Sequence, residues 1–407
     1  MSFPDHTLPP HLDVRSRPRT ALRRACFAAF LGLFLADLAL SLWISRSGTL
    51  AGRPLPPFGA ITNPRQREWI AREREALRIG ANSTNPGSFD AELGWTVAPK
   101  RRSSDGRVCT NSLGARGERE YAPEKPAGIL RAVFFGDSYT WCDEVDDAST
   151  FEAQLEALDP RIEAFNFGVA AYGTDQALLR WRRDGRALGA DVACLGILLE
   201  NIGRNVNRYR PLWYPASASN GAKPRFLVEG GELLLVPHGF ATQRELFDAI
   251  EDGSVLTRLA EHEAWRDVPD LGLLRFSSFA RIAGAWRAQR AREVKGLWLD
   301  EQGEARRVTL AIVEHFRAEA LASGAKRVLV LLFPRQDDLS ERSTQKGVYW
   351  RSAVRELESL GIEVLDLSEA LAEVAVEQGP AQLYGGGHLS RAGNATVATT
   401  LRSALLR

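Results

Sequence analysis

The sequence predicts an α/β fold with a mostly parallel sheet, because apolar runs of strand length alternate with stretches of helical periodicity from residue 132 onward. The five predicted strands are residues 132–135, 162–167, 192–199, 327–333 and 362–365. The predicted helices are residues 151–158, 175–188, 305–322, 348–360 and 390–406. Strand and helix alternate in this way when helices cover both faces of a parallel sheet.

The first predicted strand ends in a tight turn that exposes a hydroxyl group. The strand stops at Gly136, and Asp137 and Ser138 follow it directly. Glycine permits a sharp turn, and the Asp137 carboxylate can accept hydrogen bonds from backbone N–H groups of that turn. Ser138 would then lie at the carboxyl ends of the strands, where open α/β sheets bind their ligands. The same tripeptide also suits an ordinary turn, so both interpretations stay open at this point.

Three further short motifs follow in order along the chain. Asn166-Phe167-Gly168 ends the second strand, Asn201 follows the third, and a segment around His388 lies near the carboxyl terminus. This series resembles the SGNH, or GDSL, family of serine esterases, whose four sequence blocks carry Ser, Gly, Asn and His in that order. From about Gly94 to the end, the resemblance implies a flavodoxin-like sheet with strand order 2-1-3-4-5. We expect neither a cofactor nor a metal.

The resemblance also implies a role for each motif residue. Ser138 would be the nucleophile, and its backbone N–H, the N–H of Gly168 and the side-chain amide of Asn201 would stabilise the oxyanion. Asn205 is an alternative to Asn201, because the block here lacks the usual glycine and aspartate on either side of the asparagine. His388 would accept the serine proton. A separation of about 2.6–3.2 Å between these two side chains would support catalysis.

The carboxylate that would orient His388 is missing from its usual place. The family normally carries an aspartate three residues before the histidine, where this chain has Gly385. Three possibilities follow. Ser138 and His388 act as a dyad with a backbone carbonyl in the orienting role, or Asp366 at the end of the fifth strand reaches back, or the site is inactive.

An apolar stretch at residues 25–45 is long enough to cross a bilayer as a helix. Asp37 is its one charge and would cost roughly 2.5–3.5 kcal/mol at mid-membrane, which the surrounding Leu and Phe residues can offset. Five arginines lie between residues 15 and 24, whereas only Arg46 and Arg53 follow closely. We therefore expect a single-pass protein of the inner membrane, with residues 1–24 as a disordered cytoplasmic tail and the large domain in the periplasm. No convincing cleavage site follows, which favours a retained signal anchor.

Residues 46–92 are predicted to form a juxtamembrane spacer and helix. The spacer, residues 52–64, is rich in Pro and Gly. Residues 65–78 mix Arg and Glu at helical spacing, which is typical of a solvated helix with exposed ion pairs, and contact between its basic face and anionic headgroups is the alternative. The catalytic domain would then begin at residue 93 with short strands that form a small β appendage. Arg116, in this part, could serve an anionic substrate, but the need of buried arginines for a charged partner favours a structural salt bridge.

A long interval separates the third and fourth strands. Residues 202–303 are too many for a bare connection, so we expect an insertion or cap that shapes access to the substrate. Within it, residues 224–237 indicate a β-hairpin that turns at Gly230-Gly231, and residues 256–286 are largely helical in pattern.

Composition excludes some classes of function. With 52 basic and 51 acidic residues, the net charge of +1 gives no indication of nucleic-acid binding. The four cysteines have no CxxC spacing, which argues against a structural zinc site. A Cys109–Cys142 disulfide is possible if the domain lies outside the cytoplasm.

Two hypotheses from different classes follow. The first is a membrane-anchored serine esterase or acyltransferase that acts on an ester, such as an O-acetyl group, of a cell-surface or secreted glycan. The glycan substrate is inferred from family analogy and location alone, and a lipase or thioesterase of the same fold is an alternative. The second is a non-catalytic, membrane-tethered glycan-binding module that uses the same cleft, which the missing aspartate motivates.

Overall fold

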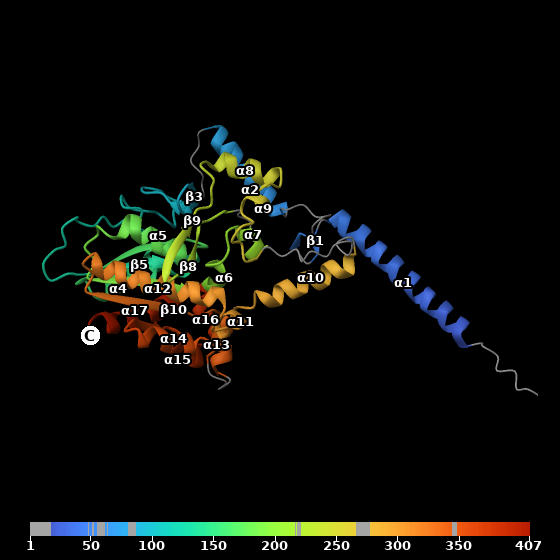
Figure 1. Ribbon diagram of the computed structural model, residues 1–407. Coiled ribbons are helices and arrows are strands. Elements are labelled where there is room, and N and C mark those ends of the chain that lie inside the picture. Colours follow the sequence, from blue (N-terminus) through green and yellow to red (C-terminus); the bar gives the residue numbers. More distant parts are fainter. Residues whose placement is uncertain are drawn as a thin grey trace, which may run out of the picture.

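The centre of the molecule is a five-stranded parallel sheet in the order β11-β10-β7-β5-β6 (Figure 1). Counted along the chain this order is 2-1-3-4-5, so the flavodoxin-like prediction is confirmed. The strands are β5 Leu130–Gly136, β6 Ile162–Gly168, β7 Val192–Leu198, β10 Arg327–Phe333 and β11 Glu363–Asp366. The structure, a computed structural model, describes residues 18–47, 49–50, 53–54, 62, 64–79, 87–215, 217, 221–265, 277–343 and 348–407.

Helices cover both faces of this sheet. One face carries α4 Phe151–Leu158, α15 Ser368–Gln378 and α17 Arg391–Leu405, and the other carries α5 Thr174–Arg180, α12 Glu304–Ala322 and α14 Arg351–Ser359. Along β5, the side chains of Ala132 and Phe134 pack in the core under α4, α15 and α17. Those of Val133 and Phe135 pack in the core on the opposite face, under α5, α12 and α14. All seven residues of β7 are buried, which explains why these strands are continuous apolar runs rather than alternating ones.

One predicted helix is shorter than expected. The periodicity predicted a helix over residues 175–188, but α5 ends at Arg180 and the chain continues as a wider π-helical segment, Trp181–Gly185. Gly185 packs here against the ring of Trp181, where a Cβ would lie 2.4 Å from a ring atom. The helix therefore widens where the Trp181 ring packs directly against the backbone of Gly185.

A small β-hairpin precedes the sheet. Strands β3 Gly87–Asp90 and β4 Gly94–Val97 pair antiparallel, and the hairpin begins six residues before the expected domain boundary at residue 93. Trp95 Nε1 donates to Ala170 O at 3.0 Å, just past the end of β6. The hairpin therefore packs at the carboxyl edge of the sheet, as expected for the β appendage.

The insertion between β7 and β10 has a structure of its own. Its hairpin turns at Gly230 and Gly231, which both have positive φ, so the predicted hairpin is confirmed. In the expected helical stretch, residues 256–258 belong to α9 and residues 278–286 to α10, whereas residues 259–265 form turns, so the helical pattern is confirmed only in part. Residues 266–276 fall outside the described part of the chain. The elements of the insertion are α6 Asn201–Arg204, α7 Arg210–Trp213, β8 Arg225–Glu229, β9 Glu232–Val236, α8 Gln243–Glu251, α9 Val255–Arg258, α10 Ser278–Ala291 and α11 Val294–Leu299.

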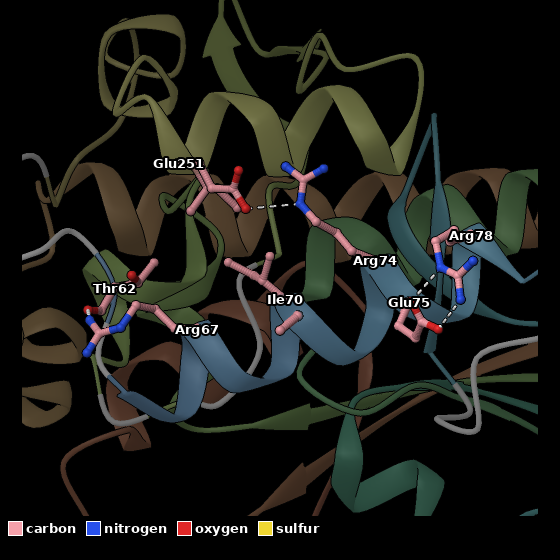
Figure 2. A pocket seen from close by; sticks show the side chains of 9 residues that line it. Thr62, Arg67, Ile70, Arg74, Glu75, Arg78 and Glu251 are labelled. Atoms are coloured by element: carbon pink, nitrogen blue, oxygen red, sulfur yellow. Dashed lines mark hydrogen bonds and ion pairs between the residues drawn. The ribbon is translucent and has the colours of Figure 1, made fainter.

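The juxtamembrane helix α2, Pro64–Arg78, is docked on the insertion rather than solvated on all sides. Its Ile70 is buried in a cluster with side chains of α8, and the Trp69 and Phe247 rings meet edge to face at 5.5 Å. Arg74 pairs with Asp248 and Glu251 of α8 at 2.7 and 3.0 Å. Figure 2 shows the hollow between the two helices. The expected ion pairs thus run mainly between helices instead of along one.

Helix α1, Pro18–Ser47, begins seven residues before the predicted start at residue 25, so the end of the predicted disordered tail is helical. It contains a 24-residue apolar segment, Thr20–Trp43, that is long enough to cross a membrane. None of its most apolar window is buried against the rest of the molecule. It is followed by the two-residue strands β1 Thr49–Leu50 and β2 Arg53–Pro54, and most of the expected spacer falls outside the described residues.

Candidate active site

Ser138 opens a short helix at the carboxyl end of β5. This helix is α3, Ser138–Trp141, and Asp137 caps it by accepting a hydrogen bond from Tyr139 N at 2.8 Å. A Cβ at Gly136 would lie 2.1 Å from a side-chain atom of the same helix, so only glycine lets the strand turn directly into α3. Because Ser138 is the first residue of the helix, its backbone N–H has no intrahelical acceptor.

His388 lies on a two-residue hairpin near the carboxyl terminus. Strands β12 Tyr384–Gly385 and β13 His388–Leu389 flank Gly386 and Gly387, whose φ values of 55° and 101° are both positive. Such a turn excludes most side chains, which accounts for the run of three glycines. The Tyr139 hydroxyl donates to Gly387 O at 2.9 Å. The hairpin is therefore tied directly to α3.

These two elements place the serine and the histidine in contact. His388 Nε2 lies 2.9 Å from Ser138 Oγ, although the two residues are 250 positions apart in the chain. The distance falls within the range that supports proton transfer between the two groups. Asp143 Oδ2, at 3.8 Å, is the more distant neighbour of the same ring nitrogen.

The other ring nitrogen faces a carboxylate that the sequence analysis did not single out. Glu144 Oε1 lies 3.4 Å from His388 Nδ1. A Cβ at Gly386 would lie 2.3–2.6 Å from the carboxylate atoms of Glu144, so this glycine leaves the room that the carboxylate occupies. The available signal was indirect: the histidine block has glycines in place of acids, and Glu144 lies only six residues after Ser138.

Arg116 anchors the loop that carries Glu144. This buried guanidinium donates to Asp147 Oδ1 at 2.8 Å, to Cys142 O at 2.7 Å and to Val145 O at 2.5 Å. It therefore fixes the backbone on both sides of Glu144, and its role is the structural one.

Asp366 has other partners. Its Oδ2 accepts a hydrogen bond from Trp350 Nε1 at 2.9 Å, and its Oδ1 accepts one from Ser368 N at 3.0 Å, next to the start of α15. Strand β11 is also the edge strand, separated from β5 by two other strands. The structure therefore does not support the prediction that Asp366 orients His388, and the carboxylate beside this ring belongs to Glu144.

The predicted oxyanion donors differ in how far they are already engaged. Gly168 N donates to Asn166 Oδ1 at 2.9 Å, and a Cβ at Gly168 would lie 2.3 Å from Trp141 N. Gly168 thus allows α3 to pack closely on β6, and its paired N–H does not support the predicted role as an oxyanion donor. Its physical role is close packing.

The two candidate asparagines also differ. Asn201 is fully buried beside the Asp137 carboxylate, whose pKa its side chain helps to lower, but neither polar atom of the Asn201 side chain has a hydrogen-bond partner of normal geometry among the described residues. Asn205 is fully engaged: it accepts from Thr174 N at 2.7 Å and donates to Thr309 Oγ1 at 2.8 Å. A buried amide without a partner is costly unless a ligand supplies one, so Asn201 is the donor left available.

Two aspartates set the local electrostatics: Asp137 is fully buried, whereas the side chain of Asp143 is 31% exposed. Burial raises the pKa of Asp137, and Arg204, whose Nη1 lies 3.3 Å from its Oδ2, opposes this shift. Desolvation by neighbouring groups raises the pKa of Asp143, against the attraction of His388 and Arg116. Ser138 Oγ, at 2.9 Å, lies closer to His388 Nε2 than the Asp143 carboxylate does. Such an arrangement can pass the serine proton to the imidazole as the oxygen attacks a carbonyl.

In the part of the chain that the structure describes, the cysteine and acidic side chains form neither a disulfide nor a metal site. All four cysteines are free, and the Cys109 thiol donates to Asp147 Oδ2 at 2.9 Å, so the possible Cys109–Cys142 disulfide is not formed. Among the described residues, no three His, Cys, Asp or Glu side chains gather where a metal ion could be held.

Comparisons with known proteins find similarity to solved structures only. No protein-family model matches the sequence, and no curated protein sequence is similar to it. Among the similar structures are an acetylxylan esterase from Geobacillus stearothermophilus (16% identity, 68% of this chain and 94% of that one, TM-score 0.36). An α/β hydrolase enzyme from the metagenome of Lake Arreo, Spain, matches at 15% identity over 68% and 94%, with a TM-score of 0.37. A putative lipolytic protein of the G-D-S-L family from Desulfitobacterium hafniense matches at 11% identity over 67% and 98%, with a TM-score of 0.34.

Proposed function

We propose that this chain is a serine esterase or acyltransferase with Ser138 as its nucleophile and His388 as its general base. The contact of 2.9 Å between Ser138 Oγ and His388 Nε2 carries the proposal. Two reactive groups from opposite ends of the domain meet at the carboxyl edge of a parallel sheet, and activating a hydroxyl is what such a pair achieves chemically.

The reaction follows from the geometry. Ser138 Oγ attacks the carbonyl carbon of the ester while its proton moves to His388 Nε2. The oxyanion that forms accepts hydrogen bonds from the Ser138 N–H and the free side-chain amide of Asn201. The carbon–oxygen bond to the alcohol then breaks, and His388 protonates the leaving oxygen. A water molecule, or the hydroxyl of a second substrate, then attacks the acyl-enzyme and gives its own proton to His388. The bond between the acyl carbon and Ser138 Oγ breaks, and His388 returns the proton to Ser138 Oγ.

Glu144 takes the place of the missing aspartate in this scheme. A carboxylate near Nδ1 holds the ring with Nε2 toward the serine and stabilises the imidazolium that forms during attack. Its side chain is 39% exposed and lies 3.4 Å from the ring, so we expect a smaller contribution than a buried, closely bonded aspartate would give. The glycan-binding hypothesis was based on the absence of a carboxylate that orients His388. The Glu144 carboxylate near His388 Nδ1 weakens that reason.

Location and resemblance support the substrate class. We propose that α1 is a retained anchor with its N-terminal arginines in the cytoplasm, which leaves the catalytic domain on the periplasmic side of the inner membrane. Esters accessible there include O-acyl groups of cell-surface or secreted glycans. An O-acetyl ester of such a glycan is therefore the proposed substrate.

Turnover of an activated acetyl ester by the full chain in detergent micelles tests the chemistry. We expect saturable hydrolysis, and a decrease in kcat/KM of at least about 10³-fold in Ser138→Ala and in His388→Ala. Thermal melting of each variant controls for folding. Equal turnover in Ser138→Ala, or no turnover by the folded parent chain, would contradict the proposal.

A further inference from the structure

The one charged residue within the apolar stretch of α1 meets the start of a helix from the insertion. Asp37 Oδ1 accepts hydrogen bonds from Phe279 N at 2.9 Å and from Ser277 Oγ at 3.2 Å. Beside it, the hydroxyl groups of Ser41 and Ser278 lie 2.6 Å apart. Figure 1 shows α10 extending from the body of the molecule to α1.

This contact satisfies polar groups on both helices. The first N–H groups of an α-helix have no intrahelical acceptors, and a carboxylate near them is also favoured by the helix dipole. Asp37 therefore caps α10 from another element. In return, the two donors compensate a carboxylate that would be costly without a partner in hydrocarbon.

The contact also sets the depth of α10 if α1 crosses a membrane. Asp37 lies six residues before Trp43, where the apolar segment ends. At a rise of 1.5 Å per residue, the start of α10 would lie about 9 Å inside that end of the span. This depth is within the about 5–10 Å to which interfacial helices bury their apolar side below the headgroups.

The surface of α10 suits that environment. Its 14 residues include no acidic side chain and three arginines. Phe279 and Trp286 are 46% and 61% exposed, and the Arg290 guanidinium lies 4.8 Å from the centre of the Trp286 ring. Exposed aromatic rings beside arginines are typical of residues at a membrane interface that contains anionic lipid.

We propose that α10 is a second membrane contact, an interfacial helix that lies in lipid beside α1 with its first turn capped by Asp37. The inference rests on the proposed anchoring of α1. A single anchor followed by a spacer would leave the domain free to rotate. Two contacts would fix the direction in which the Ser138 edge of the sheet faces.

Cysteine cross-linking in membranes tests the helix contact. The background is Cys26→Ala, because the other three cysteines are buried. Mild oxidation of Ser41→Cys with Ser278→Cys should give an intramolecular cross-link, whereas Ser41→Cys with Val376→Cys, whose site on α15 is 87% exposed, should not. Asp37→Leu should slow the cross-link and Asp37→Asn should retain it, because the amide oxygen still accepts both hydrogen bonds. No cross-link in the Ser41–Ser278 pair would overturn the proposal.

Spin labels at positions 279 and 286, with position 376 as the control, test the lipid contact in vesicles that contain anionic lipid. Oxygen should relax the first two labels more than a water-soluble nickel complex does, and the control should show the reverse. Labels at 279 and 286 that behave like the control, or that are shielded from both agents by protein, would overturn the proposal. Extraction of the whole chain by alkaline carbonate would instead show that the anchor itself fails.

Discussion

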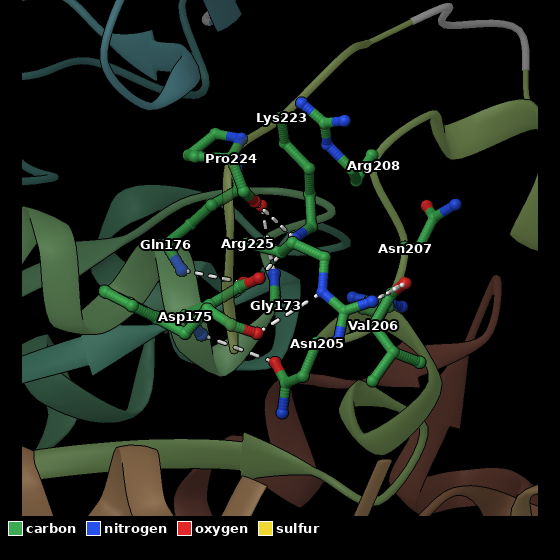
Figure 3. A network of polar contacts seen from close by, with 12 residues as sticks. Gly173, Asp175, Gln176, Asn205, Val206, Asn207, Arg208, Lys223, Pro224 and Arg225 are labelled. Atoms are coloured by element: carbon green, nitrogen blue, oxygen red, sulfur yellow. Dashed lines mark hydrogen bonds and ion pairs between the residues drawn. The ribbon is translucent and has the colours of Figure 1, made fainter. Parts of the chain in front are cut away.

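Two polar clusters lie at the carboxyl edge of the sheet, and they differ in how completely their hydrogen bonds are satisfied. The active-site cluster consists of Ser138, Glu144, Asn201 and His388. Its Asn201 amide has no partner among the described residues, and its Glu144 carboxylate is partly exposed. The inner network consists of Asp175, Gln176, Asn205, Lys223 and Arg225, and Figure 3 shows its side chains turned toward one another.

Within the inner network the groups are paired on several sides. Asp175 accepts from Lys223 Nζ and from Gln176 N, the latter at 2.8 Å. Burial raises the pKa of Asp175 and lowers the pKa of Lys223, and the attraction within the pair opposes both shifts. The comparison shows that a satisfied buried network joins the insertion to the sheet, whereas unsatisfied or exposed polar groups are those available for chemistry.

The largest effect on stability should come from breaking the inner pair. We expect Lys223→Met to lower the free energy of unfolding by about 3–5 kcal/mol, because Asp175 is left buried without its counter-ion. Chemical denaturation measures this change. The double variant Lys223→Met with Asp175→Leu should recover most of it, and a single variant as stable as the parent would contradict the structural role.

The two asparagines sharpen the comparison further. Asn201→Ala should lower kcat by about 10²–10³-fold, because one oxyanion donor is lost, with KM and the melting temperature little changed. Asn205→Ala is the matched control, and its main effect should be a lower melting temperature, because it removes the hydrogen bonds to Thr174 and Thr309. A lower kcat in Asn205→Ala and a lower melting temperature in Asn201→Ala would contradict the roles proposed for the two asparagines.

A smaller effect on activity is expected at Glu144. Glu144→Gln should lower kcat/KM by about 10–100-fold, less than the roughly 10⁴-fold typical for a buried triad acid. Initial rates with an activated acetyl ester measure this change. Asp366→Asn is the control and should leave kcat/KM unchanged. A loss of activity in the Asp366 variant alone would restore the original prediction for that residue.

The smallest effect concerns Asp191, at the opposite edge of the sheet. Burial alone would raise its pKa, but hydrogen bonds from Arg131 N and the ammonium groups of Lys125 and Lys326 lower it to about 2 from 3.8. The carboxylate therefore stabilises the fold above about pH 4, and this contribution is lost as the pH falls through about 2. Asp191→Asn should cost about 1–2 kcal/mol at pH 7 and much less at pH 2, as measured by urea unfolding at each pH.

The sheet could be predicted from sequence because its central strands β5, β7 and β10 are buried on both faces and are therefore nearly continuous apolar runs. Ser138 and His388 could be singled out because the short glycine-containing motifs around them resemble two blocks of the SGNH family, and such motifs are local in sequence. Glu144 could not be predicted, because its approach to His388 depends on the fold of two distant loops and on the space above Gly386. The docking of α2 on α8 was missed for a similar reason, since only a few apolar side chains, Ile70 among them, mark the buried side.

The most direct test of the account is covalent labelling of the folded full chain with a fluorophosphonate, followed by mass spectrometry of its peptides. The account predicts one adduct, on Ser138, which forms much more slowly in His388→Ala and is absent from Ser138→Ala. A folded chain that gains no adduct at Ser138, or one that is labelled equally well without His388, would contradict it.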